Sequence, residues 1–266
     1  DANAVRRLNQ FTGPFILRRM KSEVLRELPP KTENVRRVEL ETEQRKLYLA
    51  AVVDAREKLR AAKPEDKMTV FAVLMRLREI CCDPRLVADN WTGSSAKLEA
   101  CLELVTEAVA GGHRILLFSQ FTSMLELLAK RLDEAGVSHF TLQGSTPKPV
   151  RAEQVRRFNQ GEADVFLISL RAGGTGLNLT AADIVIHYDP WWNLAAQNQA
   201  TDRAYRIGQR NPVQVYRLIA QDTIEEKIVE LQQAKQSLAD TVTGGADGAI
   251  LSMNPEQLLQ LLGEEA

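Results

Sequence analysis

The chain has few of the residues that disulfide-stabilised or metal-binding proteins need. It contains only three cysteines and three histidines in 266 residues. Cys81 and Cys82 are adjacent, so a regular disulfide framework is excluded and a reducing compartment is favoured. The histidines are scattered and lack the spacing of zinc ligands. We therefore expect neither a disulfide framework nor a metal site in this chain.

Long apolar runs are also absent. No stretch approaches the roughly 20 apolar residues that are needed to cross a bilayer, so we expect no membrane partner. Hydrophobic residues make up 44% of the chain and charged residues 26%, which is typical of a globular protein with a substantial core. The sequence begins at Asp1 with neither an initiator methionine nor a signal-peptide pattern. We expect a piece of a longer protein.

The usual phosphate-binding motifs are missing or incomplete. A P-loop requires a Gly-Lys pair, and the sequence contains none, so this chain cannot be a self-sufficient P-loop ATPase. Residues 174–176 begin a dinucleotide fingerprint, but Leu179 occupies its third glycine position and disfavours a nicotinamide-dependent oxidoreductase. Residues 133–136 imitate the start of a DEAD or DEAH box, yet they end a predicted helix, whereas the metal-binding acid of such a box should end a buried strand.

The net charge is only −1, but the charges are unevenly distributed. Residues 148–217 contain nine Lys/Arg and six Asp/Glu, whereas residues 221–266 contain two Lys and nine Asp/Glu. A basic middle beside an acidic tail is compatible with one phosphate-facing surface. On charge alone, chance unevenness explains the distribution equally well.

Hydrophobic periodicity divides the chain into a helical part and an α/β part. Residues 45–59 and 68–80 have helical spacing, residues 33–40 read as a short extended run, and residues 90–95 read as a linker. Beyond residue 96, helices alternate with continuously apolar strands at 114–119, 138–142, 164–169, 184–187 and 213–219. Continuous apolar strands separated by helices predict a parallel sheet that is covered by helices on both faces.

One polar motif follows the strand at 184–187. Gln199, Asp202, Arg203 and Arg206 have the spacing i, i+3, i+4 and i+7, which would place them on one face of a helix that begins near Asn193. Two guanidiniums on one face suit the charge of a transferred phosphoryl group, as in an arginine finger. The alternative is a solvated helix face with ordinary ion pairs.

Small and polar residues follow the other predicted strands, where ligands of parallel sheets bind. They lie at 119–120, 143–146, 169–178 and 189–193. The last of these segments contains Trp191 and Trp192, whose side chains point in different directions. We expect one tryptophan in the core and the other free to stack on a nucleic acid, unless both are packed.

Taken in order, these segments resemble the second RecA-like lobe of the SWI/SNF family of ATP-dependent DNA translocases, within superfamily two helicases. The resemblance spans nearly the whole chain. The matching segments are residues 14–31, 77–86, 95–98, 115–122, 142–146, 169–183 and 189–209. It implies an α/β fold, a RecA-like parallel sheet covered by helices on both faces, with an α-helical N-terminal protrusion and C-terminal brace helices.

The resemblance also implies an ATP site shared between two lobes. Arg203 and Arg206 would be catalytic arginine fingers that reach ATP held by the first lobe. Gln199 and Asp202 would orient them, and Gly176 would lie near the nucleotide. ATP would bind with Mg²⁺, and the metal would be held by the absent first lobe.

By the same resemblance, backbone and side chains of the strand-end loops would track a DNA strand, and Trp192 would lie against DNA. The remaining implied DNA-binding residues are Ser119, Gln120, Gly144, Ser145, Thr146, Ser169, Arg171, Ala172 and Gly173. The chain departs from the family pattern at Asp83, Gln143, Leu194 and Tyr205. Of these departures, Gln143 leaves the preference for a base or a DNA strand open at that position.

The implied domains are residues 1–40 leaving the first lobe, 41–94 as the helical protrusion, 95–221 as the RecA-like lobe, and 222–266 as the helical brace. The implied partners are double-stranded DNA, the first lobe of the same protein, and a DNA-bound protein target. The lack of long insertions favours a prokaryotic source and a nucleoid location, whereas a eukaryotic member would be nuclear. The alternatives are a nucleic-acid-binding module without a catalytic role and an RNA or DNA helicase lobe.

Overall fold

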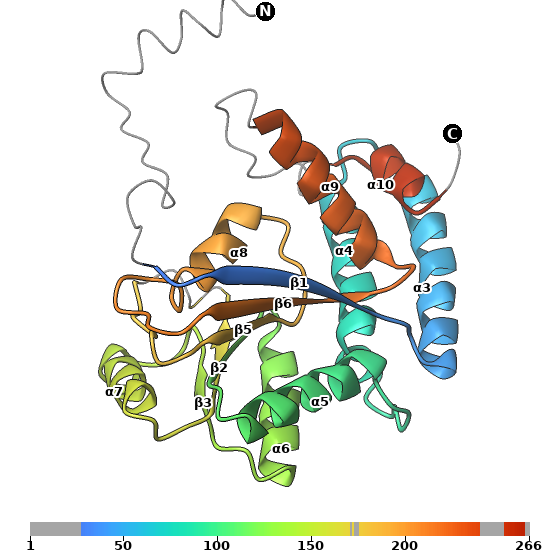
Figure 1. The fold of residues 1–266 in the computed structure, drawn as a ribbon. Coiled ribbons are helices and arrows are strands. Elements are labelled where there is room, and N and C mark those ends of the chain that lie inside the picture. The colour runs from blue at the N-terminus through green and yellow to red at the C-terminus, as the bar shows by residue number, and fades with distance from the viewer. Residues whose placement is uncertain (1–27, 171, 173–175, 240–252, 264–266) are drawn as a thin grey trace, which may run out of the picture.

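The computed structural model describes residues 28–170, 172, 176–239 and 253–263. Within them, six strands form one parallel sheet in the order β1-β6-β5-β2-β4-β3, so the predicted α/β sheet is confirmed (Figure 1). The strands are β1 (Lys31–Val38), β2 (Ile115–Ser119), β3 (His139–Leu142), β4 (Val165–Ser169), β5 (Ile184–His187) and β6 (Val213–Ala220).

Helices cover both faces of the sheet because its central strands are apolar on both sides. In β2, Ile115 and Leu117 pack with α5 (Ala96–Ala110) and α6 (Thr122–Glu134). Leu116 and Phe118, which point to the other face, pack with α7 (Lys148–Asn159) and α8 (Leu194–Thr201). Alternate residues of one strand therefore fill two separate cores.

A third core lies beyond one end of the sheet and is built mainly from helices (Figure 1). It includes Tyr48 of α3 (Thr42–Ala61) and Leu74 of α4 (Lys67–Cys82), and the short 3-10 helix η1 (Pro84–Leu86) follows α4. Ile224 of α9 (Ile224–Ala239) and Leu258 of α10 (Pro255–Leu261) complete this core. The expected protrusion and C-terminal brace thus pack on each other.

None of the described helices has the length and apolarity that a membrane span requires.

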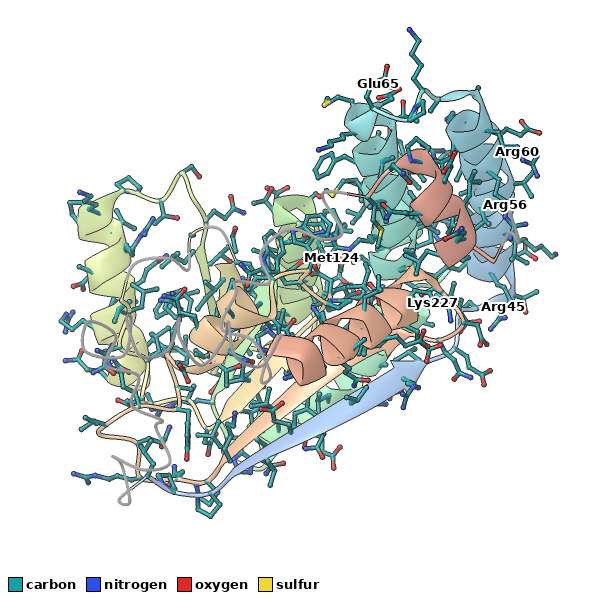
Figure 2. The ribbon with its side chains drawn as sticks, turned by 90° about the horizontal axis from the view of Figure 1, so that it is seen from above. Arg45, Arg56, Arg60, Glu65, Met124 and Lys227 are labelled. Carbon is teal, nitrogen blue, oxygen red and sulfur yellow. The ribbon has the colours of Figure 1, made fainter. Side chains whose placement is uncertain are left out.

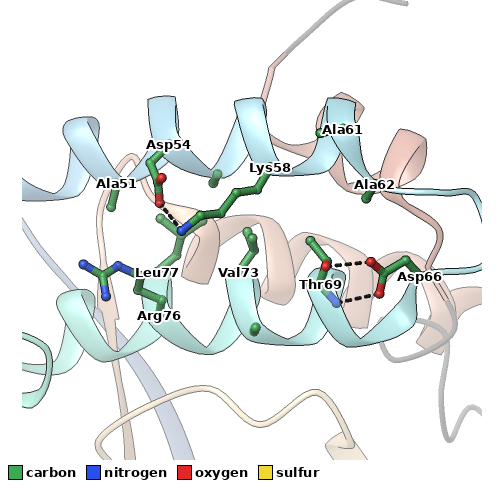
Figure 3. Close-up of a pocket in the computed structure, with 12 residues that line it drawn as sticks. Ala51, Asp54, Lys58, Ala61, Ala62, Asp66, Thr69, Val73, Arg76 and Leu77 are labelled. Carbon is green, nitrogen blue, oxygen red and sulfur yellow. Dashed lines mark hydrogen bonds and ion pairs between the residues drawn. The ribbon is translucent and has the colours of Figure 1, made fainter.

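Figure 2 views the same arrangement from above and labels Arg45, Arg56 and Arg60 along α3. Arg56 donates from Nη2 to the carbonyl of Leu262, just after α10, at 2.5 Å. A groove of about 480 Å³ separates α3 from α4, and Lys58 contacts Asp54 there at 2.7 Å (Figure 3). At the other end of the groove Asp66 caps α4 by accepting from the Thr69 backbone at 3.0 Å.

The first described strand adds a feature that the sequence did not suggest. β1 pairs in parallel with β6 along its whole length, from Lys31 opposite Val213 to Val38 opposite Ala220. The side chains of Arg217 and Glu33 form an ion pair across these strands at 2.6 Å. Residues 31–38 therefore belong to the same sheet as residues 115–220, although the sequence suggested a segment leaving another lobe. The proposed boundaries at residues 40, 94 and 221 stay predictions.

His187 at the end of β5 is a buried neutral side chain. Its ring stacks on Phe118 with centroids 5.5 Å apart, and its Nε2 lies 2.9 Å from Oγ1 of Thr201. Burial lowers the pKa of His187 to about 3, and the charge of Arg217 acts in the same direction. The folded protein therefore excludes the charged imidazolium.

This burial predicts a pH-dependent stability. An unfolded histidine has a pKa of about 6.5, so the contribution of His187 is full above that pH and is lost as the pH falls toward 3. We expect His187 to remove about 1.4 kcal/mol of unfolding free energy per pH unit within this window. Urea unfolding at a series of pH values from 7 to 4 measures this loss of unfolding free energy. His187→Gln should flatten the profile, and an unchanged slope would contradict the assignment.

Candidate functional site

The polar motif after β5 begins as a helix but does not continue as one. The Asn193 side chain caps α8 by accepting from the Ala196 backbone at 2.9 Å. The helix ends at Thr201, and residues 202–208 form turns. The prediction that one helix face carries all four motif residues was therefore wrong.

The helix stops where its backbone bonds tighten from i+4 to i+3: the Arg203 N–H donates to the Ala200 carbonyl at 3.3 Å. Farther along, two carbonyls bond outside the turn. The Arg203 carbonyl accepts from the Leu179 backbone at 3.1 Å, and the Ala204 carbonyl accepts from Nε2 of Gln209 at 3.1 Å. These acceptors are diverted from the i+4 N–H groups that would extend a helix. Gly208 then reverses the chain at a φ of 102°, where side chains are strained.

Gln209 holds the resulting loop, here called the arginine loop (residues 202–209). Its Nε2 also donates to the Ala182 carbonyl at 2.7 Å. Its Oε1 accepts from the backbones of Arg210 at 2.8 Å and Asn211 at 2.9 Å. One buried amide thus fixes both ends of the arginine loop and ties it to the segment before β5. The sequence motif gave no indication of this role for Gln209.

The arginine loop nevertheless brings the predicted nucleotide residues together. They border one open pocket of about 350 Å³. Its lining consists of Gly176, Leu177, Gln199, Asp202, Arg203, Arg206 and Ile207. All five residues predicted to contact ATP belong to this set. Their convergence comes from the folded loop and not from helical spacing.

The two arginines of the pocket differ in exposure. Arg203 is only 5% exposed, whereas Arg206 lies at the surface. Burial lowers the pKa of Arg203, and the charges of Arg151 and Arg206 lower it further. A guanidinium stays charged even after such a shift. Two cations therefore border one opening, and the charge of Arg151 also acts on Arg203, which favours an anionic ligand.

The predicted DNA-contacting loops lie at the carboxyl ends of β3 and β4. Gly144 and Ser145 are exposed, and the hydroxyl of Thr146 accepts from the Gln143 backbone at 3.0 Å to close a turn. Ala172 is buried, and its carbonyl accepts from Nη1 of Arg151 at 3.4 Å. The two loops therefore meet at the same edge of the sheet. The predicted residues Arg171 and Gly173 lie outside the described residues.

Ser119 and Ser169 require a correction. Ser119 is fully buried and Ser169 is 2% exposed. The Ser119 hydroxyl donates to Oδ1 of Asp189 at 2.6 Å, and the Gln120 backbone donates to the same oxygen at 3.2 Å. These serines sit at the ends of inner strands, where helices cover both faces. The Ser119 hydroxyl joins the end of β2 to the segment after β5, and neither serine lies on the surface that a ligand would touch.

Trp192 is half-buried and packs against the protrusion. Its ring lies 6.1 Å from the ring of Phe71 and 5.3 Å from the ring of Trp191. Both tryptophans are therefore packed, although each keeps part of its surface exposed. The sequence could not show that the neighbour of Trp192 would be a helix more than a hundred residues earlier.

The sequence analysis missed the buried pair formed by Arg78 and Asp189. Both side chains are fully buried, and burial raises the pKa of Asp189 while Arg78 and the Ser119 hydroxyl oppose this rise. Arg78 lies on the apolar stripe of its helix, four residues after Leu74 and three before Cys81. A charged residue on an apolar stripe is the signal that could have identified it.

The pocket offers no set of metal ligands within the described chain. Asp202 is the one carboxylate among its lining residues, and no group of three His, Cys, Asp or Glu side chains gathers elsewhere in the described residues. The arginines and the open backbone at Gly176 fit the phosphates of a nucleotide better than they fit a bare cation.

Comparisons with known proteins give two family matches. The Helicase conserved C-terminal domain matches residues 96–208, and the SNF2-related domain matches residues 1–86. An uncharacterised ATP-dependent helicase of Mycoplasma pneumoniae is 40% identical over 255 residues, which cover 96% of this chain and 25% of the relative. The mouse SWI/SNF-related matrix-associated actin-dependent regulator of chromatin subfamily A member 1 is 37% identical over 255 residues, covering 91% and 24%.

A solved structure extends these matches to the fold. The Sulfolobus solfataricus SWI2/SNF2 ATPase core, solved in complex with double-stranded DNA, aligns with a TM-score of 0.75 and 30% identity. The alignment covers 98% of this chain and 56% of that chain. This chain thus spans about a quarter of the two sequence relatives and about half of the solved core. The sheet and both family matches together show that the chain belongs to the SNF2 (SWI/SNF) family and contains its C-terminal helicase domain.

Proposed function

We propose that this chain is the second motor lobe of a double-stranded-DNA-dependent ATPase and translocase. The observation that carries the proposal is the pocket in which Arg203 and Arg206 meet Gly176, Gln199 and Asp202. A preceding lobe would bind ATP and Mg²⁺, since this chain has no Gly-Lys pair for a P-loop. This division of labour makes each lobe inactive by itself.

The exposure of each pocket residue suggests its role. Arg206 lies at the surface, so its guanidinium can donate in fork geometry to a phosphate that arrives from another lobe. Buried Arg203 adds a positive charge whose position is fixed by packing. Apart from its chain neighbours, no described residue has an atom within 4 Å of the position that a Cβ would occupy at Gly176, so a phosphate could approach the backbone. Gln199 and Asp202, which line the same pocket, would orient the arginines.

ATP would supply the γ-phosphoryl group whose transfer to water develops negative charge at its oxygens. The two guanidiniums stabilise this charge only when the lobes close, because the pocket is open in the isolated lobe. Opening would then separate the cations from the products. A cycle of closing and opening moves one lobe relative to the other, which is the motion that translocation requires.

The DNA track would run along the carboxyl edge of the sheet. Exposed Gly144 and Ser145, the Thr146 turn and half-exposed Trp192 offer backbone, hydroxyl and ring contacts to a phosphate backbone. The alignment with the DNA-bound Sulfolobus core supports a duplex as the ligand. In a cell, the protein would act on nucleoid or nuclear DNA and would displace or remodel a DNA-bound protein.

The experiment is ATP hydrolysis by the intact protein with and without nucleic acid. We expect double-stranded DNA to raise the rate severalfold, because both lobes must close on one duplex. The isolated chain of 266 residues should not hydrolyse ATP. Stimulation by RNA alone would favour an RNA helicase, and salt-dependent duplex binding without hydrolysis would favour a pure binding module. Either outcome would overturn the proposal.

A further inference from the structure

The buried Arg78–Asp189 pair lies where the protrusion meets two neighbouring strand ends. Arg78 belongs to α4, and Asp189 follows β5. Nη2 of Arg78 donates to Oδ2 of Asp189 at 3.2 Å and to the carbonyl of Pro190 at 2.6 Å. The other oxygen of Asp189 holds the end of β2 through Ser119. One guanidinium therefore connects three segments that are far apart in the sequence.

Aromatic rings complete the surroundings of Arg78. Its Cζ lies 4.5 Å from the centroid of the Trp192 ring and 5.6 Å from that of Phe121. Within the described part of the chain, Nε and Nη1 of Arg78 are buried without a hydrogen-bond partner. Ring faces attract a guanidinium and so replace acceptors on that side. The Arg78 guanidinium therefore packs directly against the Trp192 ring.

A second contact fixes the same loop from the C-terminal brace. Gln232 of α9 donates through Nε2 to the carbonyl of Trp191. The loop after β5 is thus held by α4 through Arg78 and by α9 through Gln232. Both helices also share the third core, where Leu74 and Ile228 are fully buried. The protrusion, the brace and the Trp192 loop consequently form one packed unit.

A buried ion pair is weak evidence for stability, because apolar residues of similar volume often stabilise a site equally well. Directional contacts instead specify one arrangement of the groups around them. Arg78 contacts the Trp192 ring directly and is linked through Asp189 to the backbone of Gln120. Trp192 and Gln120 are both predicted to face DNA. The pair therefore sets the relative position of two DNA-facing loops.

We propose that Arg78 is a positioning residue that couples the helical protrusion to the DNA track by fixing the Trp192 loop. The inference deepens the proposed function and rests on it. Arg78 is buried and does not touch the nucleic acid itself. It acts through the ring of Trp192 and the carboxylate of Asp189. Duplex engagement at Trp192 would then be transmitted to α4 as a movement of one rigid unit.

The test measures the duplex concentration that gives half-maximal ATPase stimulation of the intact protein. We expect Arg78→Gln to raise this concentration about tenfold, with the rate at saturating DNA within about twofold of the original. Arg78→Lys keeps a cation for Asp189 but loses the guanidinium that lies over the Trp192 ring, so it should fold normally and still raise the value. Arg78→Lys decides the question if Arg78→Gln fails to fold.

Arg76→Gln is the matched control, because Arg76 is exposed on the same helix and the substitution is identical. It should leave the half-maximal concentration unchanged. In a Trp192→Ala background, Arg78→Lys should have no further effect if Arg78 acts through that ring. If DNA stimulates the original protein but Arg78→Lys shows the same half-maximal DNA concentration, this inference alone would be overturned. An original protein that DNA does not stimulate would overturn the proposed function as well.

Discussion

Replacing Arg206 by alanine in the intact protein should lower DNA-stimulated ATP turnover about 10³-fold or more, the range found when an arginine finger is lost. Arg206 is the exposed arginine of the pocket, so its removal leaves no cavity in the core. The loss should therefore fall on turnover, because the charge that the guanidinium neutralises develops in the transition state. Steady-state hydrolysis at saturating ATP and DNA measures the effect.

Arg210 supplies the matched control for this experiment. It is also exposed and lies four residues after Arg206, but it does not line the pocket. Arg210→Ala removes the same charge from the same surface region and should retain most of the turnover. Unfolding transitions of both variants should match that of the original protein. If Arg206→Ala kept near-normal turnover, the arginine-finger role would have to be abandoned.

The sheet was predictable because its central strands follow a simple physical rule. β2, β4 and β5 are buried at every position, and each was recognisable as an apolar run. Strands of this kind need helices on both faces, and the intervening amphipathic segments supplied them. β1 was harder to assign, because most of its side chains are exposed and only its pairing with β6 places it in the sheet.

The site was only partly predictable, since long-range hydrogen bonds decide its shape. Helical spacing placed Arg203 and Arg206 on one face of a helix, but α8 ends at Thr201, and bonds from Leu179 and Gln209 hold the loop that follows. The residue set was nevertheless right, because the same bonds draw the loop against Gly176. Local periodicity can group residues correctly while a distant contact sets their geometry.

Burial was the other property that local sequence did not reveal. Ser119 follows an apolar run and was expected to face a ligand, yet its hydroxyl bonds Asp189, which lies 70 residues away. Arg78 and Asp189 are separated by 111 residues. Neither residue has a neighbour in the sequence that indicates its partner. Such pairs become visible only when α4 and the end of β5 are placed side by side.

A second buried ion pair, between Lys97 and Glu225, joins the start of the lobe to the brace. Nζ of Lys97 donates to both carboxylate oxygens of Glu225, at 2.6 and 2.5 Å, and both side chains are fully buried. Burial alone would lower the pKa of Lys97, but the Glu225 carboxylate outweighs it and raises that pKa. Glu225 also accepts from the Ala220 backbone at 2.8 Å, where β6 ends. The pair therefore links α5, β6 and α9.

Lys97→Met should destabilise the protein by about 3–5 kcal/mol, because it leaves the Glu225 carboxylate buried without its cation. Urea unfolding of the intact protein measures the loss. Lys58→Met is the control, since its pair with Asp54 is also short, at 2.7 Å, but is about half exposed, and its loss should cost less than about 1 kcal/mol. Adding Glu225→Gln to Lys97→Met should recover much of the stability, because the amide oxygen can still accept from Ala220 and no buried charge remains. If Lys97→Met lowered the free energy of unfolding no more than Lys58→Met, the Lys97–Glu225 pair would not be a main contact between α5 and α9.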